Sequence, residues 1–484
     1  MGDLLNAFPV DTGLKKGKDK TRRDEYLFPP LSEVAIKRSP MKKITFTRRE
    51  FLGKSSAGLA AASLVTRAPA VSGNPNALAL HGGTPVRTKP FPEWPQTFEL
   101  DEANILKSLR GHRWCTIDTG NFIPEFEKAW ARELGVRGCV TTPCGTHALH
   151  TALELLGVSP GDEVLVAPYT YIATIDAILL NFALPVFVDT DLKTFTMDPD
   201  DIEHRITGDT RAILPVHMLS NAAHMDKILA VANKHNLPVV EDACQAHTTT
   251  WRGKRLGTLG KVGCFSFQES KLLPGGELGA LVSDDAELIE KAYTWRNFGF
   301  HPTTHRIVIR GTKYRTSDFA PAVALAQMTR YLRVHAVEEA NAAYLKEQLK
   351  KIPGIYPQEQ YPETANHAYY HFGMRYDSAY FNGVPRDQIV KALNAEGIPI
   401  EGAYGPALNR EPYLEHTLNS RAFQRIYSKE RLARYREQNH CPHNDQLTAT
   451  AMEFEHEILS GPKEDIDDIA AAFDKVHRNA AALS

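Results

Sequence analysis

The sequence predicts an α/β protein built around a mostly parallel β-sheet. Short aliphatic and β-branched segments alternate along the chain with segments of helical spacing, and this alternation is typical of parallel strands joined by crossover helices. In such sheets ligands bind beyond the carboxyl ends of the strands, so the residues that follow each strand are candidates for a site. The expected strand and helix pairs are 163–167 with the segment after Tyr171, 184–188 with 199–204, and 212–216 with 224–234. The apolar spacing at 122–134 predicts a further helix, which Gly135 would end.

Size and composition are those of a soluble enzyme. The 484 residues are enough for two domains with substantial cores. Hydrophobic residues make up 43% and charged residues 24% of the chain, and the net charge of -2 offers no basic surface for nucleic acid. The six cysteines contain no CxxC pair, which argues against a zinc site or a disulfide scaffold and favours maturation in a reducing compartment.

Residues 1–73 are expected to form a leader. Residues 1–40 are rich in lysine and arginine, lack apolar periodicity and are predicted to be disordered. Met41 then begins a basic segment that is followed by an apolar run at 57–65 and a small-residue cleavage site, the order of a cleavable signal. The pair Arg48-Arg49 resembles the twin-arginine export signal, which predicts a periplasmic or other extracytoplasmic protein and makes Met41 a candidate initiator.

The alternative for this leader is a chance basic-then-apolar segment, in which case the protein would stay cytoplasmic. The apolar run is too short to span a bilayer, so no stable membrane insertion is expected. Twin-arginine export is associated with proteins that fold around a cofactor before they cross the membrane.

Two domains are expected after the leader, a large one at 74–335 and a smaller carboxyl-terminal α/β domain at 336–484. A long helical stretch at 318–349, with Pro321 in its first turn, is the predicted connector. The smaller domain is expected to contain a strand at 367–376, a helix at 386–396 and a closing helix from about residue 466.

Lys271 is the first candidate for chemistry. It follows a short apolar and aromatic strand at 265–267 and precedes the glycine-rich run 274–279. A lysine in this position can present its amine to a ligand. Taken alone, the pattern does not exclude an ordinary solvated surface lysine.

Gly145 and Thr146 open a predicted helix that runs to about residue 156. Free backbone N–H groups at a helix start, together with a threonine hydroxyl, suit a phosphate group, although the same residues cap ordinary helices. Tyr171 follows the expected strand 163–167 and could stack on a flat ring, the alternative being core packing.

Asp242 lies just after the expected strand 237–240. Its structural interpretation is a cap on the following turn. Its functional interpretation is a carboxylate that pairs with a protonated ring nitrogen, which makes the ring an electron sink for chemistry at an amine-bearing carbon.

These residues occur within blocks that resemble the DegT/StrS family of pyridoxal 5'-phosphate (PLP) dependent sugar and cyclitol aminotransferases of fold type I. The resemblance covers most of residues 79–475 and is closest to the branch of scyllo-inosose aminotransferases and 3-amino-5-hydroxybenzoate synthase. The blocks include GTHALHTALELLGVSPGDEVLVAPYTYIAT, VDTDLKTFTMDP, ILPVHMLSNAAHMD, VVEDACQAH, FSFQESK and LNAEGIPIEGAY.

The resemblance implies a PLP-binding large domain, a Schiff base between Lys271 and the cofactor, and a homodimer with shared active sites. It also implies a role for each of several other residues. These are Asp242 at the pyridine nitrogen, Gln245 near the phenolic oxygen, Tyr171 on the ring face, Gly145, Thr146 and Ser266 at the phosphate, and His217 and Tyr404 in the substrate pocket.

Three substitutions depart from the family's pattern, and the histidine that the family carries after a Tyr-x-Pro segment is not evident near Tyr404. Cys144 replaces the usual serine before Gly145, and Leu278 replaces a glycine of the cofactor loop. Lys313 stands where an asparagine typically reaches the neighbouring subunit's phosphate, and an ammonium group could bind the phosphate as a point charge.

The predicted reaction is a ping-pong transamination from an amino acid, glutamine or glutamate, to a keto sugar or keto cyclitol. One alternative is a related dehydratase that uses the pyridoxamine form, although such members carry histidine where this chain has Lys271. A non-catalytic sensor that keeps the fold is another. A dinucleotide-dependent oxidoreductase is disfavoured because no GxGxxG motif follows a strand. No metal is expected, since His301 and His305 lack a third ligand.

Overall fold

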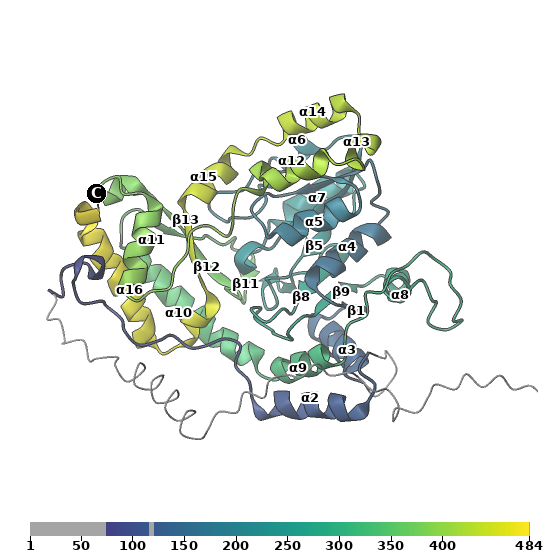
Figure 1. The fold of residues 1–484 in the computed structure, drawn as a ribbon, viewed down its shortest axis with the longest axis horizontal. Helices are drawn as coiled ribbons and strands as arrows, with labels where there is room; N and C mark the ends of the chain where they lie inside the picture. The colour runs from purple at the N-terminus through teal and green to yellow at the C-terminus, as the bar shows by residue number, and fades with distance from the viewer. Residues whose placement is uncertain (1–73, 116–120, 484) are drawn as a thin grey trace, which may run out of the picture. The chain divides into compact units, whose positions relative to one another are not determined.

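The computed structural model describes residues 74–115 and 121–483 of the chain (Figure 1). The twin-arginine segment and the rest of the expected leader lie outside the described residues. No helix within the described ranges combines the length and the apolar character needed to span a bilayer.

The central sheet is mostly parallel, as predicted. One part has the strand order β1-β9-β8-β5 and another the order β3-β2-β4, and parallel bridges from Ile213 to Val239 and from Val216 to Asp242 join β4 to β5. Only β9 among these strands runs antiparallel to its partners. The strands are β1 Gly138–Thr142, β2 Glu163–Val166, β3 Leu184–Phe187, β4 Thr210–Leu214, β5 Val240–Asp242, β8 Val262–Ser266 and β9 Gly279–Ser283.

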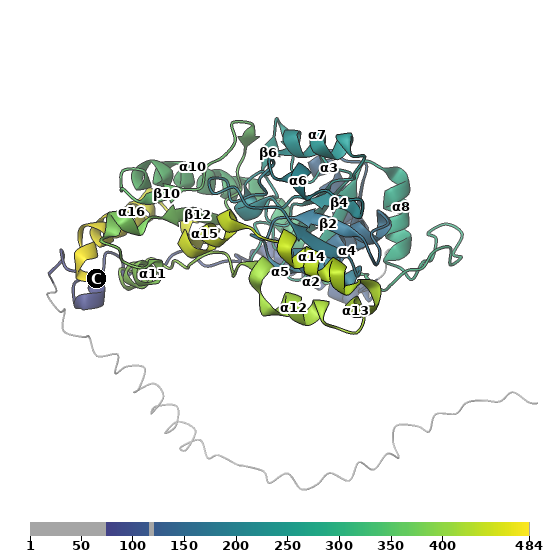
Figure 2. The same cartoon turned by 90° about the horizontal axis from the view of Figure 1, so that it is seen from above.

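Helices pack around this sheet (Figures 1 and 2). The helix α3 spans Phe122–Leu134, as expected from its apolar spacing, and ends where Gly135 takes a left-handed conformation with φ 72°. The helix α4 lies against β8 and β9, which brings its amino-terminal end to the sheet edge where β5 and β8 end. The other helices of this part are α2 Glu99–Gly111, α4 Gly145–Leu155, α5 Ile172–Leu180, α6 Ile202–Arg205, α7 Met225–Lys234, α8 Ala286–Trp295 and α9 Phe319–Met328.

A second, antiparallel sheet with the order β10-β12-β13 has a core of its own. Figure 1 shows α10, α11 and α16 around this sheet. The elements are β10 Ile355–Pro357, β12 His371–Tyr376, β13 Ala451–Glu455, α10 Tyr331–Leu349, α11 Arg386–Ala395, the 3-10 helix η5 His456–Ser460 and α16 Lys463–Arg478.

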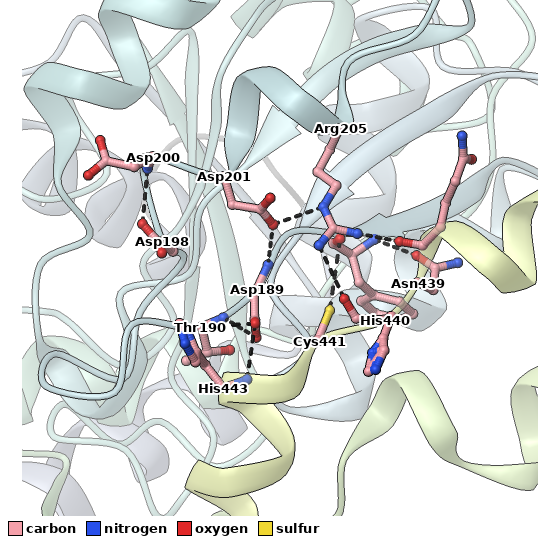
Figure 3. A network of polar contacts seen from close by, with 12 residues as sticks. Asp189, Thr190, Asp198, Asp200, Asp201, Arg205, Asn439, His440, Cys441 and His443 are labelled. Carbon is pink, nitrogen blue, oxygen red and sulfur yellow. Dashed lines mark hydrogen bonds and ion pairs between the residues drawn. The ribbon is translucent and has the colours of Figure 1, made fainter.

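Residues 412–450 lie within the expected smaller domain, yet their apolar side chains join the core of the first sheet. Four helices make up this segment: α12 Pro412–Leu418, α13 Phe423–Ile426, α14 Lys429–Gln438 and α15 Pro442–Thr450. Asp189 holds the start of α15 by accepting from the N–H groups of His443 at 3.0 Å and Asn444 at 2.9 Å. Figure 3 shows the contact between Asp189 and His443. A carboxylate there satisfies free N–H groups at the start of α15. The expected domain boundaries themselves stay a prediction.

Several expected elements differ in extent, and the strand expected at 367–376 begins only at His371. The stretch 318–349 is two helices, α9 and α10, because Arg330 leaves the helical conformation and pairs with Asp101 at 3.1 Å. The helix expected at 199–204 is a single turn, α6. The strand β5 begins at Val240 rather than residue 237, so Asp242 is its last residue.

Candidate active site

A cavity of about 410 Å³ lies where β5 and β8 end and α4 begins. Its position is the one expected for a ligand site in a parallel sheet. The lining residues are Cys144, Gly145, Thr146, Leu149, Thr170, Tyr171, Ala173, Thr174, Val216, Asp242, Cys244, Gln245, Ser266, Gln268, Ser270, Lys271, Glu277, Tyr370 and Tyr404.

The start of α4 forms one end of the cavity. Cys144 is extended, with φ -160° and ψ 170°, and the helix begins at Gly145. The N–H groups of the first helical turn have no partner within a helix and remain available to an anion. A Cβ on Gly145 would lie 2.9 Å from Sγ of Cys244 and 2.9 Å from Cβ of Ser266, so only glycine allows this close approach of helix to strand.

Ser266 ends β8 beside this helix start and is 8% exposed. Its carbonyl oxygen lies 2.8 Å from Nε2 of His247. Because a carbonyl can only accept, His247 carries its hydrogen on Nε2. Burial lowers the pKa of His247 to about 3, so the ring stays neutral and the bond is maintained at physiological pH.

Asp242 lies on the floor of the cavity and is 4% exposed. Its Oδ2 accepts from Oγ1 of Thr174 at 2.8 Å, and its Oδ1 accepts from the N–H of Cys244 at 3.1 Å. These two bonds orient the carboxylate. Within the described part of the chain no cationic side chain forms an ion pair with Asp242, so this buried acid can pair with a cationic ligand atom.

Lys271 lies in the turn after β8 and also lines the cavity. Its N–H donates to the carbonyl of Gln268 at 2.8 Å, which closes the turn. Its Nζ lies 3.9 Å from the centre of the Tyr370 ring, a cation–π contact. The hydroxyl of Tyr370 in turn lies 2.9 Å from Oγ of Ser270, so this ring is fixed beneath the amine.

Gln245 and Tyr171 complete the cavity wall. Oε1 of Gln245 accepts from the N–H of Leu219 at 2.6 Å, which leaves the hydrogens on Nε2 for a ligand. Tyr171 precedes α5 and is 59% exposed despite its size. Its ring centre lies 6.4 Å from that of Tyr404 in an edge-on arrangement. An exposed aromatic ring at a cavity rim can stack on a planar ligand.

Comparison with known proteins gives the family. Residues 97–451 match the model of the DegT/DnrJ/EryC1/StrS aminotransferase family. The chain belongs to this family. An L-glutamine:2-deoxy-scyllo-inosose aminotransferase of Streptoalloteichus tenebrarius is 35% identical over 424 residues, covering 84% of this chain and 99% of the relative. An enzyme of the same name from Streptomyces fradiae is 34% identical over 428 residues, covering 84% of this chain and 99% of the relative.

Solved structures agree with this assignment. The crystal structure of 3-amino-5-hydroxybenzoic acid (AHBA) synthase superposes with a TM-score of 0.72 at 28% identity, covering 81% of this chain and all of that one. The chain is therefore a PLP-dependent aminotransferase of fold type I, as its resemblance implied.

The residues that line the cavity suit the PLP group that this family binds. The start of α4 with Ser266 suits the phosphate, since Gly145 lets the helix start lie against Ser266 and the N–H groups of a first helical turn can bind an anion. Asp242 is a buried acid without an ionic partner in the described chain, and Lys271 supplies an amine in the same cavity. Seven of the predicted residues line it together: Gly145, Thr146, Tyr171, Asp242, Gln245, Ser266 and Lys271.

Tyr404 also lines the cavity, but His217 and Lys313 do not. His217 is fully buried, with Nδ1 accepting from the N–H of Ala223 at 3.3 Å and Nε2 lying 3.0 Å from Oε2 of Glu241. It therefore stabilises the segment after β4 instead of reaching into the pocket. Lys313 forms a backbone bridge with Asn297.

The structure shows what surrounds two of the substitutions that depart from the family pattern, Leu278 and Cys144. Leu278 is fully buried in the core that contains Phe267 and does not line the cavity. Cys144 lines the cavity and precedes the helix. Although burial opposes the change, contacts with His147 lower the pKa of the Cys144 thiol.

Several cavity residues were missed from the sequence. Thr174 lies one helical turn after Tyr171, and Ser270 directly precedes Lys271, so both could have been inferred from their neighbours. Tyr370 could not, because it lies about one hundred residues later in a segment that was expected to be a strand.

Proposed function

We propose that this aminotransferase moves an amino group from L-glutamine to a keto cyclitol or keto sugar by a ping-pong reaction. The observation that carries the proposal is the convergence of Lys271, Asp242 and the start of α4 on one cavity. The donor and the acceptor class are supported by the two relatives, which match over nearly their full lengths and are named L-glutamine:2-deoxy-scyllo-inosose aminotransferases.

The lining of the cavity favours a free keto cyclitol over a nucleotide-linked sugar. Most of its polar side chains are neutral hydroxyl and amide groups, and Lys271 is the only cation among the described lining residues. Hydroxyl and amide groups can both donate to and accept from the hydroxyls of a neutral polyol. A nucleotide diphosphate would require arginine or lysine partners for its charge.

Each part of the site has a task in this reaction. Bound PLP would supply an electron sink for the electron pair released at the amine-bearing carbon. Backbone N–H groups at the start of α4 and the hydroxyl of Ser266 would hold its phosphate. Asp242, oriented by Thr174, would accept a hydrogen bond from the protonated ring nitrogen and stabilise its positive charge.

Lys271 would perform the proton transfers. Its Nζ would remove the proton from the donor's α carbon and hold that proton for the return transfer. The ring of Tyr370 lies beneath Nζ and limits where the amine can move. This gives the transfer a defined geometry.

A direct test is a screen of acceptors with L-glutamine as donor. We expect amination of 2-deoxy-scyllo-inosose, with a nucleotide-linked keto sugar turned over much more slowly, and no product with Lys271→Ala. Amination of the nucleotide-linked sugar alone would contradict the proposal that the acceptor is a free keto cyclitol. Product formation by Lys271→Ala would contradict the proposed role of the lysine.

We also propose a homodimer in which Lys313 binds the phosphate in the partner's site. Lys313 does not line the cavity of its own chain, and the phosphate end of that cavity has no cationic side chain among its described residues. The same segment exposes large apolar side chains that a subunit interface would cover: Phe298, Phe300, Ile307 and Val308.

Subunit mixing tests this arrangement. In a heterodimer of Lys271→Ala and Lys313→Ala subunits, one site would keep both lysines, so a random mixture should recover roughly a quarter of wild-type activity. If Lys313 acted within its own chain, both sites of the heterodimer would be defective and no activity would return.

Export by the twin-arginine route is the proposed localisation, supported by the order of the arginine pair, apolar run and cleavage site in the sequence. Cell fractionation with Arg48→Lys and Arg49→Lys combined tests it. We expect the wild type outside the cytoplasm and the variant retained inside, and uncleaved cytoplasmic wild-type protein would contradict it.

A further inference from the structure

A buried carboxylate, Glu338, lies behind the active site and accepts from two histidines. Glu338 is on α10 and fully buried. Its Oε2 lies 2.7 Å from Nδ1 of His335, one turn earlier on the same helix, and its Oε1 lies 2.9 Å from Nδ1 of His456 at the start of η5. Burial alone would raise the pKa of Glu338, but the two imidazole rings lower it to about 2, so the group is ionised.

The second ring nitrogen of His335 bonds to the backbone of the lysine turn. Nε2 of His335 lies 3.2 Å from the carbonyl oxygen of Leu272, the residue after Lys271. A carbonyl and an ionised carboxylate can only accept, so both ring nitrogens of His335 must carry hydrogen and the ring is a cation. The charge of Glu338 is thus balanced by a charged ring that bonds to the carbonyl of Leu272, the residue after Lys271.

His456 differs from His335 in this respect. Its Nε2 is buried and has no hydrogen-bond partner among the described residues. One hydrogen, on Nδ1, satisfies its contact with Glu338. Its ring centre lies 4.6 Å from that of Trp94 and 6.4 Å from that of Tyr370, so it packs beside the aromatic ring that underlies Nζ of Lys271.

The bond to Leu272 acts on the direction of the Lys271 side chain. The turn is already held on its amino-terminal side, where the N–H of Lys271 bonds to Gln268. His335 holds the chain on the other side, one peptide beyond Lys271, and Leu272 itself is fully buried. Because the backbone is held on both sides of Lys271, the direction of its Cα–Cβ bond is restrained.

We propose that His335 is a positioning residue for Lys271, which it aligns through the carbonyl of Leu272 while Glu338 and His456 hold its ring in place. The inference rests on the assignment of Lys271 as the lysine that binds the cofactor. The proposal gives a function to this buried ionic cluster. A cluster of charges is not needed merely to join α10 to η5. Such a link exists already, because Asn341 of α10 donates to the carbonyls of Leu459 at 2.7 Å and Gly461 at 2.9 Å.

Asn341 therefore offers a matched control. It is on the same helix and contacts the segment at the end of η5, but its bonds do not reach the lysine turn. His335→Leu removes both bonds of the histidine, whereas His335→Gln keeps an amide that can donate to the carbonyl of Leu272. We expect Asn341→Leu to lower thermal stability only.

The experiment measures two properties of the holoenzymes. The first is the single-turnover rate with L-glutamine, read from the cofactor spectrum, and the second is the visible circular dichroism of bound PLP, which reports how the protein orients it. For His335→Leu we expect a rate about 10- to 100-fold lower at saturating glutamine, since a displacement of about 1 Å has effects of this size. The glutamine concentration at half-maximal rate should change little, the dichroism should change, and His335→Gln should recover much of both.

A rate and a dichroism in His335→Leu that equal those of Asn341→Leu would overturn the proposal. If L-glutamine is not the donor, the dichroism still decides, so failure of the proposed donor and failure of this inference are distinguishable. If His335→Leu does not fold, the protonation of the His335 ring can be measured in the wild-type protein instead. ¹⁵N spectra of histidine-labelled holoenzyme, with the His335 signals assigned from their loss in His335→Gln, should show hydrogen on both ring nitrogens at pH 7.5. A neutral His335 ring would contradict the account.

Discussion

Replacing Gly145 by alanine would disturb the phosphate end of the cavity. The added Cβ would lie 2.9 Å from Sγ of Cys244 and 2.9 Å from Cβ of Ser266, whereas carbon atoms in contact prefer at least about 3.5 Å. The start of α4 would therefore have to move by roughly 0.6 Å. Overpacking of this kind lowers the free energy of unfolding by about 1–3 kcal/mol.

The same movement would weaken the binding of the cofactor phosphate. A hydrogen bond to a charged group contributes about 1.5–3 kcal/mol, so the loss of one N–H contact would raise the dissociation constant of PLP about 10- to 100-fold. The assay is a titration of apoenzyme with PLP, followed by its visible absorbance, together with urea unfolding of the apoenzyme.

Gly111→Ala is the matched control for Gly145→Ala. Gly111 is the last residue of α2, and no atom lies within 4 Å of a Cβ added there. We expect its stability to change by less than about 0.5 kcal/mol, with PLP affinity unaltered. Wild-type PLP affinity in Gly145→Ala would refute the placement of the phosphate at the start of α4.

Three further substitutions test other parts of the structure. Thr174→Val removes the hydroxyl that orients Asp242, and we expect the single-turnover rate with glutamine to fall about ten-fold with cofactor occupancy unchanged in the absorbance spectrum. The pKa of Glu338 is lowered from 4.5 to about 2, so its contribution, about 3 kcal/mol, is present above pH 4.5 and lost as the pH falls towards 2. In urea unfolding, the stability difference between wild type and Glu338→Gln should therefore shrink over this range, and a constant difference would contradict the pairing. Glu396→Ala leaves the buried ammonium of Lys475 without its partner at 2.8 Å and should lower the free energy of unfolding by about 3–5 kcal/mol, whereas a loss below 1 kcal/mol would contradict it.

Much of the fold could be predicted because local patterns determine it. The helix α3 has the predicted bounds, since its apolar spacing and the glycine that ends it are both local signals. The grouping of Gly145, Asp242 and Lys271 in one cavity followed from a general property of parallel sheets, whose strand ends meet at one edge. Their chemical roles stay predictions.

The features that were missed depend on contacts between distant segments. The sequence motif around His217 suggested a pocket residue, but its buried ring contacts Glu241 and is not part of the cavity lining. The cluster around Glu338 joins His335 to His456, which lies 118 residues after the carboxylate. No local pattern signals such pairs, because three-dimensional packing alone brings them together.

The most direct test of the account is covalent trapping of the cofactor. Holoenzyme reduced with borohydride, digested and analysed by mass spectrometry should carry the pyridoxyl group on Lys271, while Lys271→Ala should remain unlabelled. Label on another lysine, or wild-type protein that binds PLP without any label at position 271, would contradict the central assignment.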